Sequence, residues 1–178
     1  MSRAALISIN PKWCGKIAQN EKTLEIRKSK PKLAVPFKVY IYCTKGRGIH
    51  FWRSKTYAYA DDRSHNAFDL CGDGKVIGEF VCDRVYQYTT TNNMDGSDIT
   101  EQEVVFQSCL SRKELDAYEH SAEPKENCIY LLGLYCWHIT RLKIYEKPLE
   151  LSKIWSLNKA PQSWRYVEEV EHGLQRAD

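Results

Sequence analysis

The feature that most constrains the fold is a change of hydrophobic period near the start of the chain. Residues 4–9, "AALISI", form a short apolar run that predicts a buried strand. Asn10 and Pro11 come next, and this pair predicts a helix that begins at Pro11 with Asn10 as its cap. Apolar residues then recur at helical spacing until Asn20, and residues 23–27 alternate as a strand does. The sequence therefore predicts a strand, a capped helix and a second strand in close succession.

The second strand has one apolar and one polar face. Because successive side chains of a strand point to opposite sides, Leu24 and Ile26 share a face that we expect to be core. The opposite face lies close to the end of the helix and carries Thr23, Glu25 and Arg27. Asn20 is a suitable residue for the left-handed exit from the helix.

The remaining chain mixes strand and helix patterns, which predicts an α+β fold. Strand patterns rich in aromatic and β-branched residues cover 37–43, 76–88 and 128–151. A helix is predicted within residues 101–119, where Ser111 and Glu114 form a capping-box signature. Residues 45–75 are polar, aromatic and glycine-bearing, and this composition predicts a long connection between strands.

Charge is distributed unevenly along the chain. Residues 1–60 hold 13 Lys and Arg against 2 Asp and Glu, whereas residues 61–178 hold 13 against 21, although the net charge is only +3. Such a contrast favours a polyanion-binding surface built by the first third, and nucleic acid is the usual polyanion; a solvated basic face is the alternative.

The cysteine pattern and the apolar runs bear on the compartment. The seven cysteines are odd in number and form no C-x-x-C pair, and the N-terminus lacks the apolar core of a signal peptide. Free thiols in a reducing cytoplasm are therefore expected. The longest apolar run, residues 128–137, is far too short to span a membrane.

The first block, "ALISINPKWCGKIAQNEKTLEIRK" at residues 5–28, resembles the ASCH domain, a branch of the PUA-like superfamily. The stretches "VYIYCTK" at 39–45 and "VIGEFVCDRV" at 76–85 resemble the strands that follow in that family. Asn20 stands where many members have Gly. The resemblance implies a PUA-like mixed β-barrel with short helices packed at its ends, and RNA or a nucleoside as the ligand.

The resemblance also implies the domain organisation. We expect a single ASCH/PUA-like domain over residues 1–178, with insertions around 45–75 and a C-terminal extension from about residue 148. The sequence indicates neither the oligomeric state nor the role of the segment after residue 100.

The same resemblance implies a ligand pocket beside the first helix, lined by the K-T-x-E-x-R motif residues Lys22, Thr23, Glu25 and Arg27. Arg27 can grip a phosphate or stack on a base, Lys22 supplies a point charge, and Glu25 accepts hydrogen bonds from an exocyclic amine or holds Arg27. Taken without the resemblance, the same residues fit an exposed ion pair on a strand face, which needs no ligand.

An enzyme is the alternative interpretation. Small ASCH-domain amidohydrolases that act on N4-acetylcytidine use a lysine, a threonine and a glutamate, but their threonine aligns with Glu25 here, and Thr23 has no evident oxyanion donor. If the chain hydrolyses a modified nucleoside or RNA, Lys22, Glu25 and Glu79 are the candidate catalytic residues. The departure favours a binding protein. A protein-interaction module is a further alternative, and it would show an exposed apolar patch.

A second set of candidate residues combines basic and aromatic side chains, a composition that binds single-stranded nucleic acid by charge and stacking. These candidates are Lys28, Arg47, Trp52, Arg53 and Lys55. All of these except Lys28 lie in residues 47–57, a segment that can equally be a loop whose aromatic rings close over the core. No cofactor is expected, because no phosphate-binding glycine loop is present, and no metal is expected, because the Cys and His spacings do not fit a four-ligand site.

Overall fold

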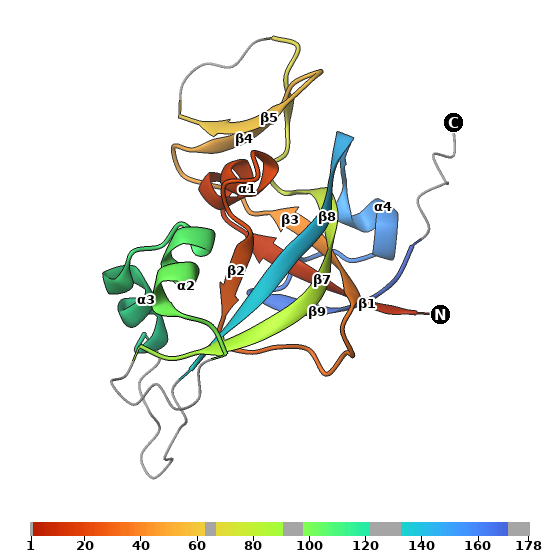
Figure 1. Cartoon of the computed structure of the whole chain (residues 1–178). Helices are drawn as coiled ribbons and strands as arrows, with labels where there is room; N and C mark the ends of the chain where they lie inside the picture. The colour runs from red at the N-terminus through yellow and green to blue at the C-terminus, as the bar shows by residue number, and fades with distance from the viewer. Residues whose placement is uncertain (1, 63–66, 91–97, 122–132, 171–178) are drawn as a thin grey trace.

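The structure is a computed structural model that describes residues 2–62, 67–90, 98–121 and 133–170. A six-stranded mixed sheet forms its centre, in the order β2-β8-β7-β3-β1-β9 (Figure 1). The strands of this sheet are β1 (Arg3–Ile9), β2 (Leu24–Arg27), β3 (Phe37–Cys43), β7 (Lys75–Tyr88), β8 (Leu134–Leu149) and β9 (Trp164–Glu168). β1 pairs in parallel with β3, and the remaining neighbours are antiparallel. The predicted α+β fold is confirmed.

The first helix connects β1 to the edge of the sheet as the sequence predicted. α1 (Pro11–Ala18) begins with Pro11 at its first position, and the Asn10 side chain accepts a hydrogen bond from the Lys12 amide at 3.0 Å. Asn20 follows with φ of 59°, the left-handed conformation expected at this exit. The turn returns the chain directly into β2, so the helix C-terminus lies beside the start of the K-T-x-E-x-R motif.

The described residues of the 45–75 segment form more regular structure than their composition predicts. They form a second, three-stranded sheet in the order β5-β4-β6, which is attached to α1 (Figure 1). Its strands are β4 (His50–Arg53), β5 (Ala58–Asp61) and β6 (Leu70–Cys71). Gly15 lets the sheet approach, because an added Cβ at Gly15 would lie 2.7 Å from the Cβ of Ala60. These strands were not predicted, since they are short and lack a period-two pattern.

Three further helices cover the main sheet. α2 (Glu101–Ser108) and α3 (Arg112–Glu119) lie together beside β2, and α4 (Leu151–Trp155) follows β8 (Figure 1). The predicted capping box of Ser111 and Glu114 is present at the start of α3. A second capping box, formed by Thr100 and Glu103, starts α2. Among the described helices, none is long and apolar enough to cross a membrane.

The sheet has two edge strands that approach each other without completing a barrel through backbone pairing. β2 and β9 end the strand order in the part of the chain that the structure describes. Side chains bridge the two edges instead: Trp164 Nε1 donates to Ser29 Oγ at 3.0 Å, and the Lys32 amide donates to the Tyr166 hydroxyl at 2.7 Å. Arg27 of β2 adds a third bridge by donating to the carbonyl oxygen of Ser8 on β1, at 2.6 Å. We call this junction between residues 27–32 and the β1/β9 edge the seam.

Candidate nucleic-acid or nucleoside site

The polar face of β2 is buried between two packed layers. Leu24 and Ile26 pack with Tyr88, Val104 and Leu115 under α2 and α3, as expected of a core face. The opposite face, which carries Glu25 and Arg27, is directed at the main core cluster instead of solvent, because Glu25 pairs across the ladder with the fully buried Trp137. An exposed ion pair is therefore the wrong description of this motif.

Three charged side chains meet on this face. Lys22, Glu25 and Arg27 have side chains that are only 2%, 8% and 12% exposed. Arg27 Nη2 lies 2.9 Å from Glu25 Oε1, and Lys22 Nζ lies 3.5 Å from Glu25 Oε2. Lys22 Nζ also donates to the carbonyl oxygen of Ser108 in α2 at 2.8 Å. We call these three residues the charged trio.

The charged trio is incompletely satisfied. Burial lowers the pKa of Lys22, and the carboxylate of Glu25 opposes this shift. Arg27 Nε is buried and has no hydrogen-bond partner, and Glu25 Oε2 has none beyond the long approach of Lys22. One donor and one acceptor of the trio are thus buried without a hydrogen bond, which is rare for buried polar atoms.

Aromatic rings surround the charged trio. The ring of Trp13 in α1 lies 5.4 Å from Lys22 Nζ. On the β8 side, Trp137 contacts Phe37 edge-on at 5.7 Å and Trp164 at 5.7 Å, and its buried Nε1 has no hydrogen-bond partner. The trio therefore lies among flat apolar surfaces beside the seam.

The structure separates the other predicted pocket residues from the trio. The Thr23 hydroxyl donates to Gln107 Oε1 at 3.2 Å, which directs it toward α2 and an amide oxygen that is no base. Glu79 lies on β7, where it accepts a hydrogen bond from Tyr145 at 2.9 Å. Its ladder partner on β8 is Lys143, whereas the trio lies opposite residues 135–137. Lys22, Glu25 and Arg27 are thus the predicted residues that the fold brings together.

The predicted nucleic-acid residues around 47–57 do not form one surface. Trp52 is buried, with 8% of its surface exposed. Arg53 is tied to the fold, since Nε donates to the Tyr145 carbonyl at 3.1 Å and Nη1 donates to the carbonyls of Ser54 and Tyr57. Arg47 and Lys55 are exposed. Of the four residues predicted in this segment, Trp52 and Arg53 therefore contribute to the packing of the small sheet, and the other two are exposed.

Lys28 takes a different place, at the end of β2. Its Nζ donates to Ser121 Oγ at 2.8 Å and lies 5.3 Å from the ring of Tyr118 on α3. Sequence reasoning could not show that aromatic residues from distant segments converge at the seam, namely Trp137 and Tyr135 on β8 and Trp164 and Tyr166 on β9. Their only local signal is a high aromatic content, which does not show that they converge.

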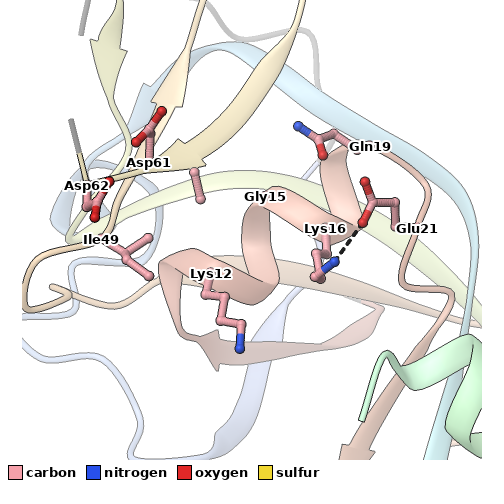
Figure 2. A pocket seen from close by; sticks show the side chains of 9 residues that line it. Lys12, Gly15, Lys16, Gln19, Glu21, Ile49, Asp61 and Asp62 are labelled. Carbon is pink, nitrogen blue, oxygen red and sulfur yellow. Dashed lines mark hydrogen bonds and ion pairs between the residues drawn. The ribbon is translucent and has the colours of Figure 1, made fainter. Parts of the chain in front are cut away.

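Two surface hollows lie away from the charged trio. One, of about 340 Å³, lies between α1 and β5 and is lined by residues of both charges, including Lys12, Lys16, Glu21 and Asp61 (Figure 2). Lys16 is paired there with Glu21 at 2.7 Å. The other, of about 380 Å³, lies between α4 and β9. Neither of these two hollows is lined by a member of the trio.

Possible metal ligands are dispersed. Within the described ranges, no three His, Cys, Asp or Glu side chains converge on a point that would hold a metal ion. The six described cysteines are free thiols, and burial raises the pKa of Cys82 and of Cys136 to about 12.

Solved structures share this architecture. No family model and no curated protein sequence matches the chain. The solved structures that resemble it include ASCH from Zymomonas mobilis and two single-substitution variants of that protein, with TM-scores of 0.60, 0.58 and 0.57 at 16% sequence identity. Each alignment covers 93% of this chain and 88%, 91% and 89% of the respective solved chain. Because each alignment covers nearly the whole chain, this chain shares the fold of these ASCH structures, an α+β architecture built on a six-stranded mixed sheet.

Proposed function

We propose that this protein binds RNA or a nucleoside, and that the charged trio contacts the ligand. The observation that carries the proposal is the burial of Lys22, Glu25 and Arg27 with polar atoms left unpartnered. Buried ion pairs rarely add stability, because the desolvation of each charge offsets the attraction between them. A group of three charges in a core therefore calls for a role other than holding the fold together.

The free atoms of the trio suit the edge of a nucleobase. Arg27 Nε offers a donor, and Glu25 Oε2 on the same face of β2 offers an acceptor. Nucleobases present donors and acceptors side by side on their polar edges, and planar guanidinium and carboxylate groups match that spacing. The rings of Trp13 and Trp137 supply the flat surfaces that bases stack upon. Lys22 and Arg27 provide positive charge for a phosphate.

The same geometry argues for binding over hydrolysis. The hydroxyl of Thr23 donates to the Gln107 side chain, so the nucleophile of the amidohydrolase interpretation lacks a base. Glu25 forms ion pairs with both Lys22 and Arg27, and these pairs hold its carboxylate in place as a hydrogen-bond acceptor for a ligand. Catalysis by water and Glu25 remains the second proposal, and a turnover assay separates it from simple binding.

The test is titration of the common nucleosides, their 5′-monophosphates and a labelled single-stranded octanucleotide RNA into wild type and Arg27→Lys protein. Lysine keeps the charge but lacks the planar fork. A hydrogen bond to a charged group contributes about 1.5–3 kcal/mol, so we expect Arg27→Lys to weaken binding by roughly 10- to 150-fold. Arg84→Lys makes the same change at an exposed position of β7 and should leave affinity unchanged.

Circular dichroism and thermal unfolding check that each variant is folded. The proposal is refuted if the wild-type protein binds neither nucleosides nor RNA. Equal affinities of folded Arg27→Lys and wild-type protein would remove the trio from the binding site.

A further inference from the structure

The seam carries positive charges that form no ion pair with the carboxylates of the described residues. Lys28, Lys30 and Lys32 follow β2 within five residues, and none of them forms an ion pair with a described acidic residue. Other lysines of the first third do have such partners: Lys16 pairs with Glu21, and Lys38 pairs with Glu169. Within the described ranges, Lys28, Lys30 and Lys32 thus differ from these paired lysines.

Two of these lysines and Arg3 of β1 lie close to aromatic rings. Lys28 Nζ is 5.3 Å from the Tyr118 ring, and Lys30 Nζ is 5.4 Å from the Tyr135 ring. On the β9 side, the Arg3 guanidinium is 5.5 Å from the Tyr166 ring. Such cation–π contacts are weak at exposed sites. A phosphate of a nucleic acid can therefore replace the ring as the partner of the lysine, and a base can then stack on that ring.

The aromatic residues form a continuous path from the trio to the surface. Trp137, the ladder partner of Glu25, contacts Trp164 at 5.7 Å, and Trp164 contacts Tyr166 at 5.3 Å. Tyr135 is the ladder partner of Arg27, so it lies on the same face of the sheet as the trio. The path runs beside residues 28–32, because Trp164 bonds to Ser29 and Tyr166 bonds to the Lys32 amide.

We propose that a single strand of nucleic acid lies along the seam, with phosphates on Lys28, Lys30 and Lys32 and bases against Tyr135, Trp164 and Tyr166. This inference rests on the proposed function, since one nucleotide of the strand would supply the base that reaches the trio. It makes the natural ligand an oligonucleotide instead of a free nucleoside. A single strand is required because stacking on the rings needs unpaired bases.

The test measures fluorescence anisotropy of a labelled single-stranded octanucleotide RNA over a series of salt concentrations. Three phosphate contacts give a slope of log affinity against log salt of about −2.1, and reversing two of those charges makes the slope shallower by about 1.4. The seam variant is Lys30→Glu/Lys32→Glu, for which we expect at least about tenfold weaker binding at low salt. The matched control is Lys143→Glu/Lys147→Glu, which reverses two exposed charges of β8 outside the seam.

Further arms separate this inference from the proposed function. Nucleoside monophosphates and a duplex of the same sequence should bind more weakly than the octanucleotide, and Lys30→Glu/Lys32→Glu should hardly change monophosphate affinity. The inference is overturned if the octanucleotide binds no more tightly than a monophosphate, or if the control variant loses more affinity than the seam variant. Either result overturns only the seam inference, because Arg27→Lys tests the proposed function separately. Loss of monophosphate binding in Arg27→Lys supports the proposed function.

Discussion

Glu25 holds two buried cations, and Glu25→Gln is the perturbation that most clearly exposes this arrangement. The substitution keeps the shape of the side chain but leaves Lys22 and Arg27 without a counter-charge at 3.5 and 2.9 Å. Breaking a buried pair by removing one partner costs about 3–5 kcal/mol. We expect a loss of about 3 kcal/mol, the lower end, because glutamine still accepts from Arg27, whose side chain keeps 12% exposure.

Urea and thermal unfolding followed by circular dichroism measure this change. For a chain of this size, a loss of about 3 kcal/mol lowers Tm by roughly 6–12 °C. Glu146→Gln is the control, since Glu146 is exposed on β8, and it should stay within about 0.5 kcal/mol of wild type. If Glu25→Gln behaves like this control, the trio is not an electrostatic unit and the reasoning fails.

The pH dependence of the same variant gives a second readout. Burial already lowers the pKa of Lys22 from 10.5, and the Glu25 charge limits that shift, so Glu25→Gln lowers the pKa further. The folded variant then binds fewer protons than the unfolded chain, and its stability rises as the pH approaches 10.5. The penalty of Glu25→Gln should therefore shrink at high pH. Lys22→Met/Glu25→Gln should remove this dependence.

Three further predictions test the fold around the site. Gly15→Ala should destabilise the protein by about 1–2 kcal/mol in urea unfolding, because its Cβ would press on Ala60 of β5, whereas a stability gain would contradict the close contact. Ser111→Ala should cost about 1 kcal/mol by removing the cap of α3. Hydrogen bonds from Ser111 lower the pKa of Glu114, so this penalty should decline as the pH falls below 4.5, and an unchanged penalty in acid would refute the capping box. Alkylation at pH 8 followed by peptide mass spectrometry should modify Cys71 and Cys109 before the buried Cys14, Cys82 and Cys136, and the reverse order would contradict the packing.

Local sequence signals predicted the elements that depend on local chemistry. Asn10 and Pro11 marked the start of α1, Asn20 marked its left-handed exit, and Ser111 marked the start of α3. Each of these signals is a hydrogen bond or a backbone preference within a few residues. The alternation of β2 also placed Leu24 and Ile26 correctly on a core face.

Long-range packing explains what the sequence could not predict. Alternation identifies two faces of β2, but only the tertiary arrangement shows that the Glu25 face is buried too, against Trp137. In the small sheet of β4, β5 and β6, Asp73 contacts β4 from outside the strands: it accepts from the Phe51 amide at 2.9 Å and lies 2.6 Å from His50 Nδ1. The seam joins segments more than a hundred residues apart, such as Ser29 and Trp164, and leaves no local pattern.

The most direct measurement of ligand binding at the trio is the nitrogen-15 NMR signal of Arg27 Nε during titration with octanucleotide RNA. Arg27 Nε has no partner in the free protein, whereas Arg53 Nε donates to the Tyr145 carbonyl and serves as an internal reference. Arg27→Lys identifies the signal by its disappearance. Binding at the trio predicts a saturable shift of Arg27 Nε with Arg53 Nε unmoved. A bound RNA that leaves Arg27 Nε unshifted would contradict it.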